Sequence, residues 1–273
     1  VPVRMSRPTV PGSYAERIVC LTEETTETLY LLGEERRIVG ISGFTVRPPR
    51  ARKEKPRVSA FTSAKIDRIL ALRPDLVLGF SDLQADIAAE LVRRGIEVHV
   101  FNQRSVAEIL RTIRTLAALV GAQARGEALC DELESGLERI RVSASAFDRR
   151  PRVYFEEWDE PPISCIRWVS ELVDVAGGDD VFPELAQCAL GKDRIVADPL
   201  EIVRRAPEVI FGSWCGKKFS PRAVAARPHW QEVPAVRDGQ LHEVKSSIIL
   251  QPGPAALTEG VRELHRVIAA WAK

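Results

Sequence analysis

Short apolar runs alternate along the chain with segments whose apolar residues recur every three or four positions. The runs, rich in Ile, Val, Leu and Phe, predict strands. Their ranges are 18–21, 38–41, 76–80, 97–101, 152–155, 208–212 and 241–244. Helices are predicted between them, over 27–32, 63–72, 83–94 and 200–205. Strands that alternate with helices indicate βαβ units and a mostly parallel sheet.

The middle of the chain, 105–143, has no strand pattern. Ser105 and Glu108 form a capping-box pattern before a first helix, and Gly121 interrupts that helix. A second helix, over 123–143, carries its leucines on one face and spans about 30 Å at 1.5 Å per residue. That length matches a domain diameter, so we predict that this helix connects two lobes. A surface helix of a single domain is the alternative.

Two internal sequence repeats support a duplicated lobe. Segment 69–79 aligns without gaps on segment 202–212, and both read as helix, Pro, acidic residue, strand and Gly. Segment 26–33 likewise pairs with 170–177. One helix–Pro–strand corner is common in α/β folds, but two in the same order on either side of a strandless region indicate duplication.

These patterns predict an α/β fold of two Rossmann-like lobes with mostly parallel sheets, joined by one long helix. The length of 273 residues fits two domains. The predicted parts are an N-terminal lobe over 1–120, a connecting helix over 121–146 and a C-terminal lobe over 147–273.

Composition narrows the class of partner. Lys and Arg (39) nearly balance Asp and Glu (38), so we expect neither nucleic acid nor an anionic membrane as partner. The basic stretch Arg47–Lys55, which contains Pro48 and Pro49 and precedes Pro56, is expected to be an irregular solvated loop. The five cysteines form no CxxC pair, which argues against a zinc or redox site.

No signal-peptide pattern or membrane-span pattern occurs in the sequence. The chain is therefore expected to be cytoplasmic if it is complete, unless a signal was removed. Nucleotide-binding and catalytic patterns such as GxGxxG, GxSxG and HExxH are also lacking. The four histidines, His99, His229, His242 and His265, are scattered. We therefore predict no catalytic residue, no metal ligand and no enzyme activity.

Aromatic and small polar residues follow the predicted strands, where parallel sheets place their ligands. A wide, partly apolar ligand needs flat rings for its faces and polar groups for its rim. Glu156 and Glu157 are adjacent on a strand, so one is expected to face the ligand and the other solvent. Core packing is the alternative role for these aromatics; Trp168 and Trp271 are expected to be packing residues, and Trp230 fits either role. The predicted ligand-binding residues are Phe44, Phe80, Ser81, Asp82, Glu156, Trp158, Trp214 and Ser246.

Several segments together resemble the periplasmic binding proteins of ABC importers that carry cobalamin, siderophores and haem, in which a single helix joins two lobes. The resemblance covers nearly the whole chain in order and is closest to the cobalamin-binding branch. Its segments are 17–21, 26–27, 37–41, 65–77, 95–98, 151–154, 176–178, 206–210, 227–230, 235–239 and 252–254.

This resemblance implies a monomer in the periplasm, a small-molecule ligand held between the lobes, and one acidic residue per lobe that docks onto the importer permease. Asp67 occupies the first docking position. Leu200 occupies the second, where an acid is expected, and Glu201 is the nearest substitute. Asp198, Pro199 and Glu201 also fit a purely structural helix start. The departure leaves room for a relative that binds a corrinoid without serving a transporter.

The leading hypothesis is binding of a corrinoid such as cobalamin, with no resident cofactor. An iron siderophore or haem is the close alternative, and it would call for several Lys or Arg residues at the strand ends. The strand ends read from the sequence offer only Lys245. Two further classes stay open: a chelatase-like enzyme acting on a metal tetrapyrrole, and a scaffold with a large apolar surface.

Overall fold

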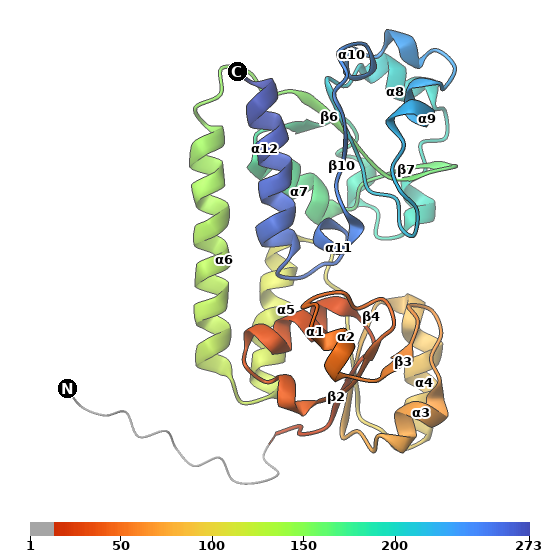
Figure 1. The fold of residues 1–273 in the computed structure, drawn as a ribbon, viewed down its shortest axis with the longest axis vertical. Helices are drawn as coiled ribbons and strands as arrows, with labels where there is room; N and C mark the ends of the chain where they lie inside the picture. The colour runs from red at the N-terminus through yellow and green to blue at the C-terminus, as the bar shows by residue number, and fades with distance from the viewer. Residues whose placement is uncertain (1–13) are drawn as a thin grey trace, which may run out of the picture. The chain divides into compact units, whose positions relative to one another are not determined.

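The computed structural model describes residues 14–273, which fold into two compact units (Figure 1). Among the described residues, the first unit contains those up to Asn102 together with Thr112–Leu129, and the second contains Gln103–Arg111 together with Cys130–Lys273. Positions 1–13 of the predicted N-terminal lobe lie outside the described residues.

The first unit is built on a five-stranded parallel sheet in the order β3-β2-β1-β4-β5. Successive residues of its central strand β1 point to opposite faces: Ile18 and Cys20 join one buried cluster, and Val19 joins another. Because both faces are buried, the strands read as continuous apolar runs, which made them predictable. The elements are β1 (Ile18–Cys20), α1 (Glu23–Leu31), β2 (Ile38–Ser42), α2 (Ala51–Glu54), β3 (Arg57–Ser59), α3 (Ile66–Ala71), β4 (Leu76–Phe80), α4 (Ala85–Arg93) and β5 (Val98–Phe101).

The second unit contains a mostly parallel sheet in the order β10-β9-β6-β7, with β8 pairing the start of β6 and β7 antiparallel to β6. Trp168 donates from Nε1 to the carbonyl of Ile249 at 2.9 Å, which confirms its packing role, and Trp230 is buried in the core. The elements are β6 (Arg152–Asp159), β7 (Pro162–Ser164), α7 (Arg167–Ala176), β8 (Asp179–Asp180), α8 (Leu200–Arg205), β9 (Val209–Gly212), α9 (Pro221–Ala225), α10 (Pro234–Arg237), β10 (Leu241–Glu243), α11 (Ser246–Ile249) and α12 (Val261–Trp271).

The predicted helices of the middle region are α5 (Val106–Leu119) and α6 (Gln123–Ala144), and each contributes residues to both units. The capping box before α5 is confirmed. The Ser105 hydroxyl accepts the Glu108 amide at 3.2 Å, and the Glu108 carboxylate accepts the Ser105 amide at 3.1 Å. Gly121, with a φ of 72°, separates the two helices.

The repeat of segment 69–79 in segment 202–212 corresponds to a backbone corner that both units share. In the first unit the chain passes from α3 to β4 through Arg73, whose φ of 48° lies in the left-handed region. Arg17, just before β1, donates from Nε to the Arg73 carbonyl at 3.0 Å. The carboxylate of Asp75 accepts the backbone amide of Arg17 at 2.9 Å. One arginine and one acid therefore clamp the turn.

The second unit repeats this clamp between α8 and β9. Ala206 has a φ of 46°, and Arg152 donates from Nε to its carbonyl at 2.9 Å. Glu208 accepts the Arg152 amide at 3.0 Å. A generic helix-to-strand corner requires neither the left-handed residue nor the arginine, so the shared details support the predicted duplication.

The basic stretch after β2 differs from the expected loop. Ala51–Glu54 forms one helical turn, α2, with Ala51 fully buried, so the prediction of irregular structure there is wrong. Pro48 and Pro49 precede the N-cap residue Arg50, so neither removes an amide hydrogen that this helix needs. Arg47 is not simply solvated either, since its Nε pairs with Glu27 at 2.9 Å.

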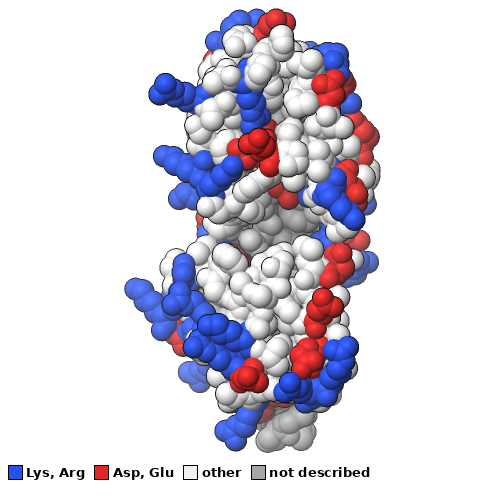
Figure 2. Space-filling model, turned by 90° about the vertical axis from the view of Figure 1, so that its right-hand side faces the viewer, with Lys and Arg blue, Asp and Glu red and all other residues white. Residues whose placement is uncertain are grey.

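Figure 2 shows one face of the molecule, on which Lys and Arg side chains stand beside Asp and Glu side chains. Neither sign of charge covers this face, in line with 39 basic and 38 acidic residues in the chain. This face therefore has no continuous basic surface of the kind that binds nucleic acid. Among residues 14–273, no helix combines the length and the apolar character that a membrane span requires.

Candidate ligand-binding site

The carboxyl edge of the first unit's sheet carries four of the predicted residues. The strand order reverses beside β1, and ligands of parallel sheets bind where it does so. Phe44, after β2, exposes 63% of its surface, whereas Phe80 and Ser81, at the end of β4, are buried. Asp82 is exposed. Phe44 is therefore the ring that this edge offers most openly.

A strained turn shapes the end of β4. Ser81 has a φ of 60°, and its hydroxyl accepts the Leu83 amide at 3.2 Å. The side chain of Gln84 locks the turn: its Oε1 accepts the Phe80 amide at 2.9 Å, and its Nε2 donates to the Phe61 carbonyl at 2.8 Å. Leu83 exposes 52% of its surface at this edge. The sequence did not single out Leu83, because it falls within a predicted helix.

Two buried carboxyl groups follow β1. Burial raises the pKa of Glu23 to about 8 and the pKa of Glu24 to about 7. The Thr22 hydroxyl donates to Glu24 at 2.6 Å. Among the described residues, no hydrogen bond reaches Oε1 of Glu23. A carboxyl group that keeps its proton near neutral pH can donate to an amide or ketone oxygen, which an ionised one cannot.

In the second unit, Glu156 sits at the centre of a buried network with no exposed surface. Arg227 holds its carboxylate with two hydrogen bonds, of 2.6 and 2.9 Å. Trp214 donates from Nε1 to the same carboxylate at 3.1 Å, and the Tyr154 hydroxyl donates to it at 3.2 Å. Four donors thus satisfy the charge, and one of them fixes the plane of the Trp214 indole.

The expectation that one of the two adjacent acids faces the ligand and the other solvent needs correction for Glu156, which has no exposed surface. Glu157 pairs with Arg194, whose guanidinium is 2% exposed and lies 3.0 Å from the carboxylate. Burial raises the pKa of Glu157 even against the neighbouring guanidinium. Glu156 is therefore fully buried, whereas the Glu157 side chain keeps 24% of its surface exposed, and each carboxylate pairs with an arginine from a distant part of the chain. The sequence around the two glutamates gave no indication of these arginine partners.

Trp158 and Trp214 share a cationic neighbour. The ammonium group of Lys217 lies 4.5 Å from the ring centroid of Trp158 and 5.0 Å from that of Trp214. Asp159 holds the same ammonium group at 2.5 Å. A cation over an indole face is attracted by the electron-rich ring. Lys217 therefore ties the two predicted tryptophans into one cluster at the end of β6 and β9.

A cavity of about 330 Å³ opens at the carboxyl ends of β9 and β10. Its wall includes two residues predicted from the sequence, Trp214 and Ser246. Lys217 and Lys218 were missed, since charged loop residues after a glycine read as ordinary solvated positions. The complete wall is Trp214, Gly216, Lys217, Lys218, Glu243, Val244, Lys245, Ser246 and Ser247.

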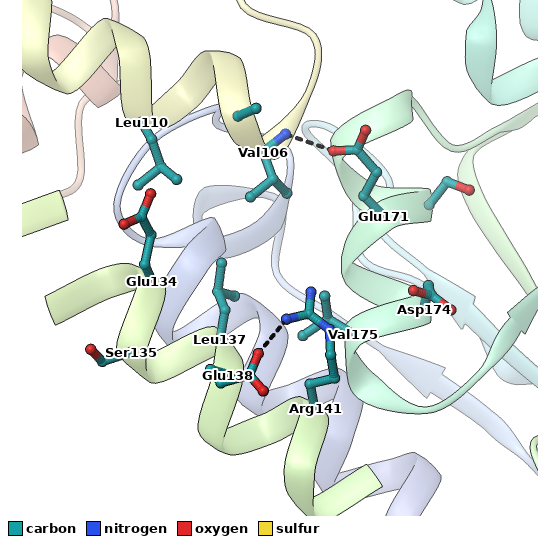
Figure 3. A pocket seen from close by; sticks show the side chains of 12 residues that line it. Val106, Leu110, Glu134, Ser135, Leu137, Glu138, Arg141, Glu171, Asp174 and Val175 are labelled. Atoms are coloured by element: carbon teal, nitrogen blue, oxygen red, sulfur yellow. Dashed lines mark hydrogen bonds and ion pairs between the residues drawn. The ribbon is translucent and has the colours of Figure 1, made fainter. Parts of the chain in front are cut away.

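A larger cavity, of about 840 Å³, lies among α5, α6 and α7 and contains none of the predicted ligand residues (Figure 3). Several of its polar groups already have partners within the chain. The carboxylate of Glu171 accepts the Val106 amide at 2.7 Å, and Arg141 pairs with Glu138 at 2.6 Å. This geometry favours a structural groove over a ligand site.

The two predicted docking positions differ in their surroundings. Asp67 in α3 is exposed and makes no hydrogen bond or ion pair with the described residues. Glu201 pairs with Arg204 at 2.7 Å and with Arg205 at 3.0 Å, both on its own helix. Leu200, at the position where the family implies an acid, is 40% exposed. The first position offers a free charge and the second does not.

The described residues, 14–273, hold no group of three or more His, Cys, Asp or Glu side chains suited to a metal ion. His99 lies within β5, with its ring centroid 4.3 Å from that of Phe101, and His242 lies within β10 and contacts Gln240 at 3.0 Å. Burial lowers the pKa of both imidazoles. What these ends of the strands offer is aromatic walls, hydroxyls and ammonium groups.

Comparison with known proteins identifies the family. Residues 18–248 match the periplasmic binding protein family, so the chain belongs to it. It is 25% identical to the vitamin B12-binding protein of Vibrio parahaemolyticus, over 94% of this chain and 91% of that protein. It is also 25% identical to an uncharacterized ABC transporter substrate-binding lipoprotein of Bacillus subtilis, over 93% of this chain and 80% of that protein.

The fold also matches solved structures. A periplasmic haem-binding protein from Pseudomonas aeruginosa superimposes with a TM-score of 0.79 at 20% identity, over 95% of this chain and 94% of that one. The match agrees with the predicted two-lobe α/β fold. At this identity it is evidence for the fold alone.

Proposed function

We propose that the chain binds a tetrapyrrole without transforming it, with a corrinoid as the first candidate, and delivers it to an ABC importer. The observation that carries this proposal is Trp214, which lines a cavity at the ends of parallel strands and shares the neighbouring ammonium group of Lys217 with Trp158. Indole faces suit the flat, apolar faces of a macrocycle. The similarity to a vitamin B12-binding protein over most of both chains supports the corrinoid.

Residues of both units contribute in this proposal. In the first unit, exposed Phe44 supplies an apolar surface. In the second unit, Trp214, which is 6% exposed, contacts the ligand through the part of its side chain that lines the cavity, and Glu156 acts through it, since Glu156 has no exposed surface of its own. The remaining predicted contacts are Phe80, Ser81, Asp82 and Ser246.

Haem is the second candidate, and the lysines favour it. A haem carries anionic propionates, which the predicted single lysine would not balance. The cavity brings Lys217 and Lys218 to Lys245, so the strand ends are more basic than the sequence alone indicated. That removes part of the argument that separated a corrinoid from an anionic chelate.

Location and partner follow from the same proposal. The family and the relative named as a lipoprotein of an ABC transporter support action outside the cytoplasm, and we propose that the chain acts there as a monomer. We propose that Asp67 makes the main contact with permease arginines. Glu201 contributes less, because Arg204 and Arg205 already neutralise it.

Absorbance and calorimetric titration of the purified chain with cyanocobalamin, haem and a ferric siderophore tests the ligand class. We expect saturable one-to-one binding of cyanocobalamin and recovery of the ligand unchanged. Tight binding of only haem or only the siderophore would move the chain to that branch. Chemical change of the ligand would favour the chelatase-like alternative. If none of the three ligands binds, a tetrapyrrole or chelate ligand is refuted.

A further inference from the structure

The cavity beside Trp214 differs chemically from the rest of the strand ends. Three ammonium groups, those of Lys217, Lys218 and Lys245, line it with a single carboxylate, Glu243. The Glu243 carboxylate already accepts the backbone amide of Phe219 at 3.2 Å. The cavity is therefore positively charged overall, although the chain as a whole is close to neutral.

The three lysines have different freedom. Lys217 is held by Asp159 and by the two indole faces. Lys218 and Lys245 are exposed, and neither makes an ion pair or hydrogen bond with the described residues. The charges of Lys218 and Lys245 are available to a ligand, whereas the ammonium group of Lys217 already interacts with Asp159 and the two indole rings.

Neutral donors accompany these charges. The side chains of Ser246 and Ser247 line the same wall, and Ser246 also contacts the thiol of Cys215. Hydroxyl donors next to ammonium groups suit an oxyanion, because each of its oxygens accepts more than one hydrogen bond. Lys218 and Lys245 would repel a cation, and an uncharged apolar group would gain no charge interaction from them, so both suit this cavity less well than an oxyanion.

We propose that this cavity receives an oxyanion carried by the bound ligand, a phosphodiester or a carboxylate, with Lys218 and Lys245 supplying the charge and the serines supplying hydrogen bonds. The inference rests on the proposed function and adds to it. The macrocycle lies against the indoles, while its anionic arm enters the cavity at their side. Charge in this cavity then selects for ligands that carry such an arm.

The test compares ligand pairs that differ in the anionic group. Cyanocobalamin carries a phosphodiester that dicyanocobinamide lacks, and haem carries carboxylates that its dimethyl ester lacks. Each is titrated calorimetrically into the wild-type chain and into the double variant Lys218→Gln/Lys245→Gln. Lys192→Gln is the matched control, because Lys192 is also exposed, belongs to the same unit and lies outside the cavity wall. Thermal melts check that all variants fold.

The proposal predicts that the double variant binds the anionic ligand roughly five- to tenfold more weakly, the range for two exposed charge contacts. Binding of the partner ligand without the anion stays within about twofold, and the Lys192 variant behaves as wild type. Rising salt weakens wild-type binding of the anionic ligand more than that of the double variant. A response to the phosphodiester pair, the carboxylate pair or both identifies the source of the anion.

Unchanged affinity of the double variant for both anionic ligands would overturn the inference and leave the proposed function intact. Equal weakening for a ligand and its uncharged counterpart would overturn it as well, since the lysines would then act on the shape of the site. No saturation of the wild-type chain by any of the four ligands would refute the proposed function and this inference together.

Discussion

Replacing Arg227 by Met tests the buried network that holds Trp214. Glu156 has no exposed surface, and Arg227 supplies two of its four hydrogen bonds. Removing one partner of a buried ion pair costs about 3–5 kcal/mol, because the other charge stays buried without compensation. Trp214 and Tyr154 still donate to the carboxylate, so we expect the low end, about 3 kcal/mol. For a chain of this size that lowers Tm by about 6–12 °C.

Urea unfolding followed by tryptophan fluorescence and far-ultraviolet circular dichroism measures the loss. Two further variants sharpen it. Adding Glu156→Gln to Arg227→Met should recover at least half of the lost stability, because the amide carries no charge to bury. Arg237→Met, which removes an exposed pair with Asp238, should cost less than about 0.5 kcal/mol. A loss below about 1 kcal/mol for Arg227→Met, or no recovery in the double variant, would refute the reasoning.

Three other predictions concern stability. Because the pKa values of Glu23 and Glu24 are raised in the folded chain, the folded state binds more protons than the unfolded state between pH 4.5 and about 8. The free energy of unfolding should therefore fall as pH rises through that window, and Glu24→Gln should make the fall less steep. A wild-type stability that rises over this range would contradict the raised pKa values. Gly212→Ala should destabilise by about 2 kcal/mol or more in urea titration, because its Cβ would come within 1.9 Å of the Phe219 ring; a neutral result would mean that the ring moves freely. Ser105→Ala should cost about 1 kcal/mol by loss of the helix cap, whereas Ser105→Asp should retain most of the stability; equal losses would argue against a capping role.

The sequence predicted those parts of the fold whose cause is local. Strands buried on both faces read as apolar runs, and the capping box at Ser105 was legible because both partners lie within one turn. The short strands β3, β7 and β8 were not predictable. They contain two or three residues each, and they exist because neighbouring strands pair with them, which no local pattern records.

The candidate site divides in the same way. Trp214 and Ser246 were predictable, because each follows a strand of a parallel sheet, and the structure brings both to one cavity. The lysines of this cavity were not predictable as a group. Lys218 and Lys245 are distant in sequence and meet only through the pairing of β9 with β10. The role of Glu156 was also hidden, since its partner Arg227 lies 71 positions further along the chain.

Calorimetric titration of cyanocobalamin into the wild-type chain and into Trp214→Ala most directly tests the central claim that an indole at a strand end forms the wall of a tetrapyrrole site. Trp168→Phe, which alters a buried packing residue, is the control. We predict one-to-one binding by the wild-type chain, binding at least tenfold weaker by folded Trp214→Ala, and wild-type affinity in the control. Equal affinity in all three, or no binding by the wild-type chain, would contradict the account.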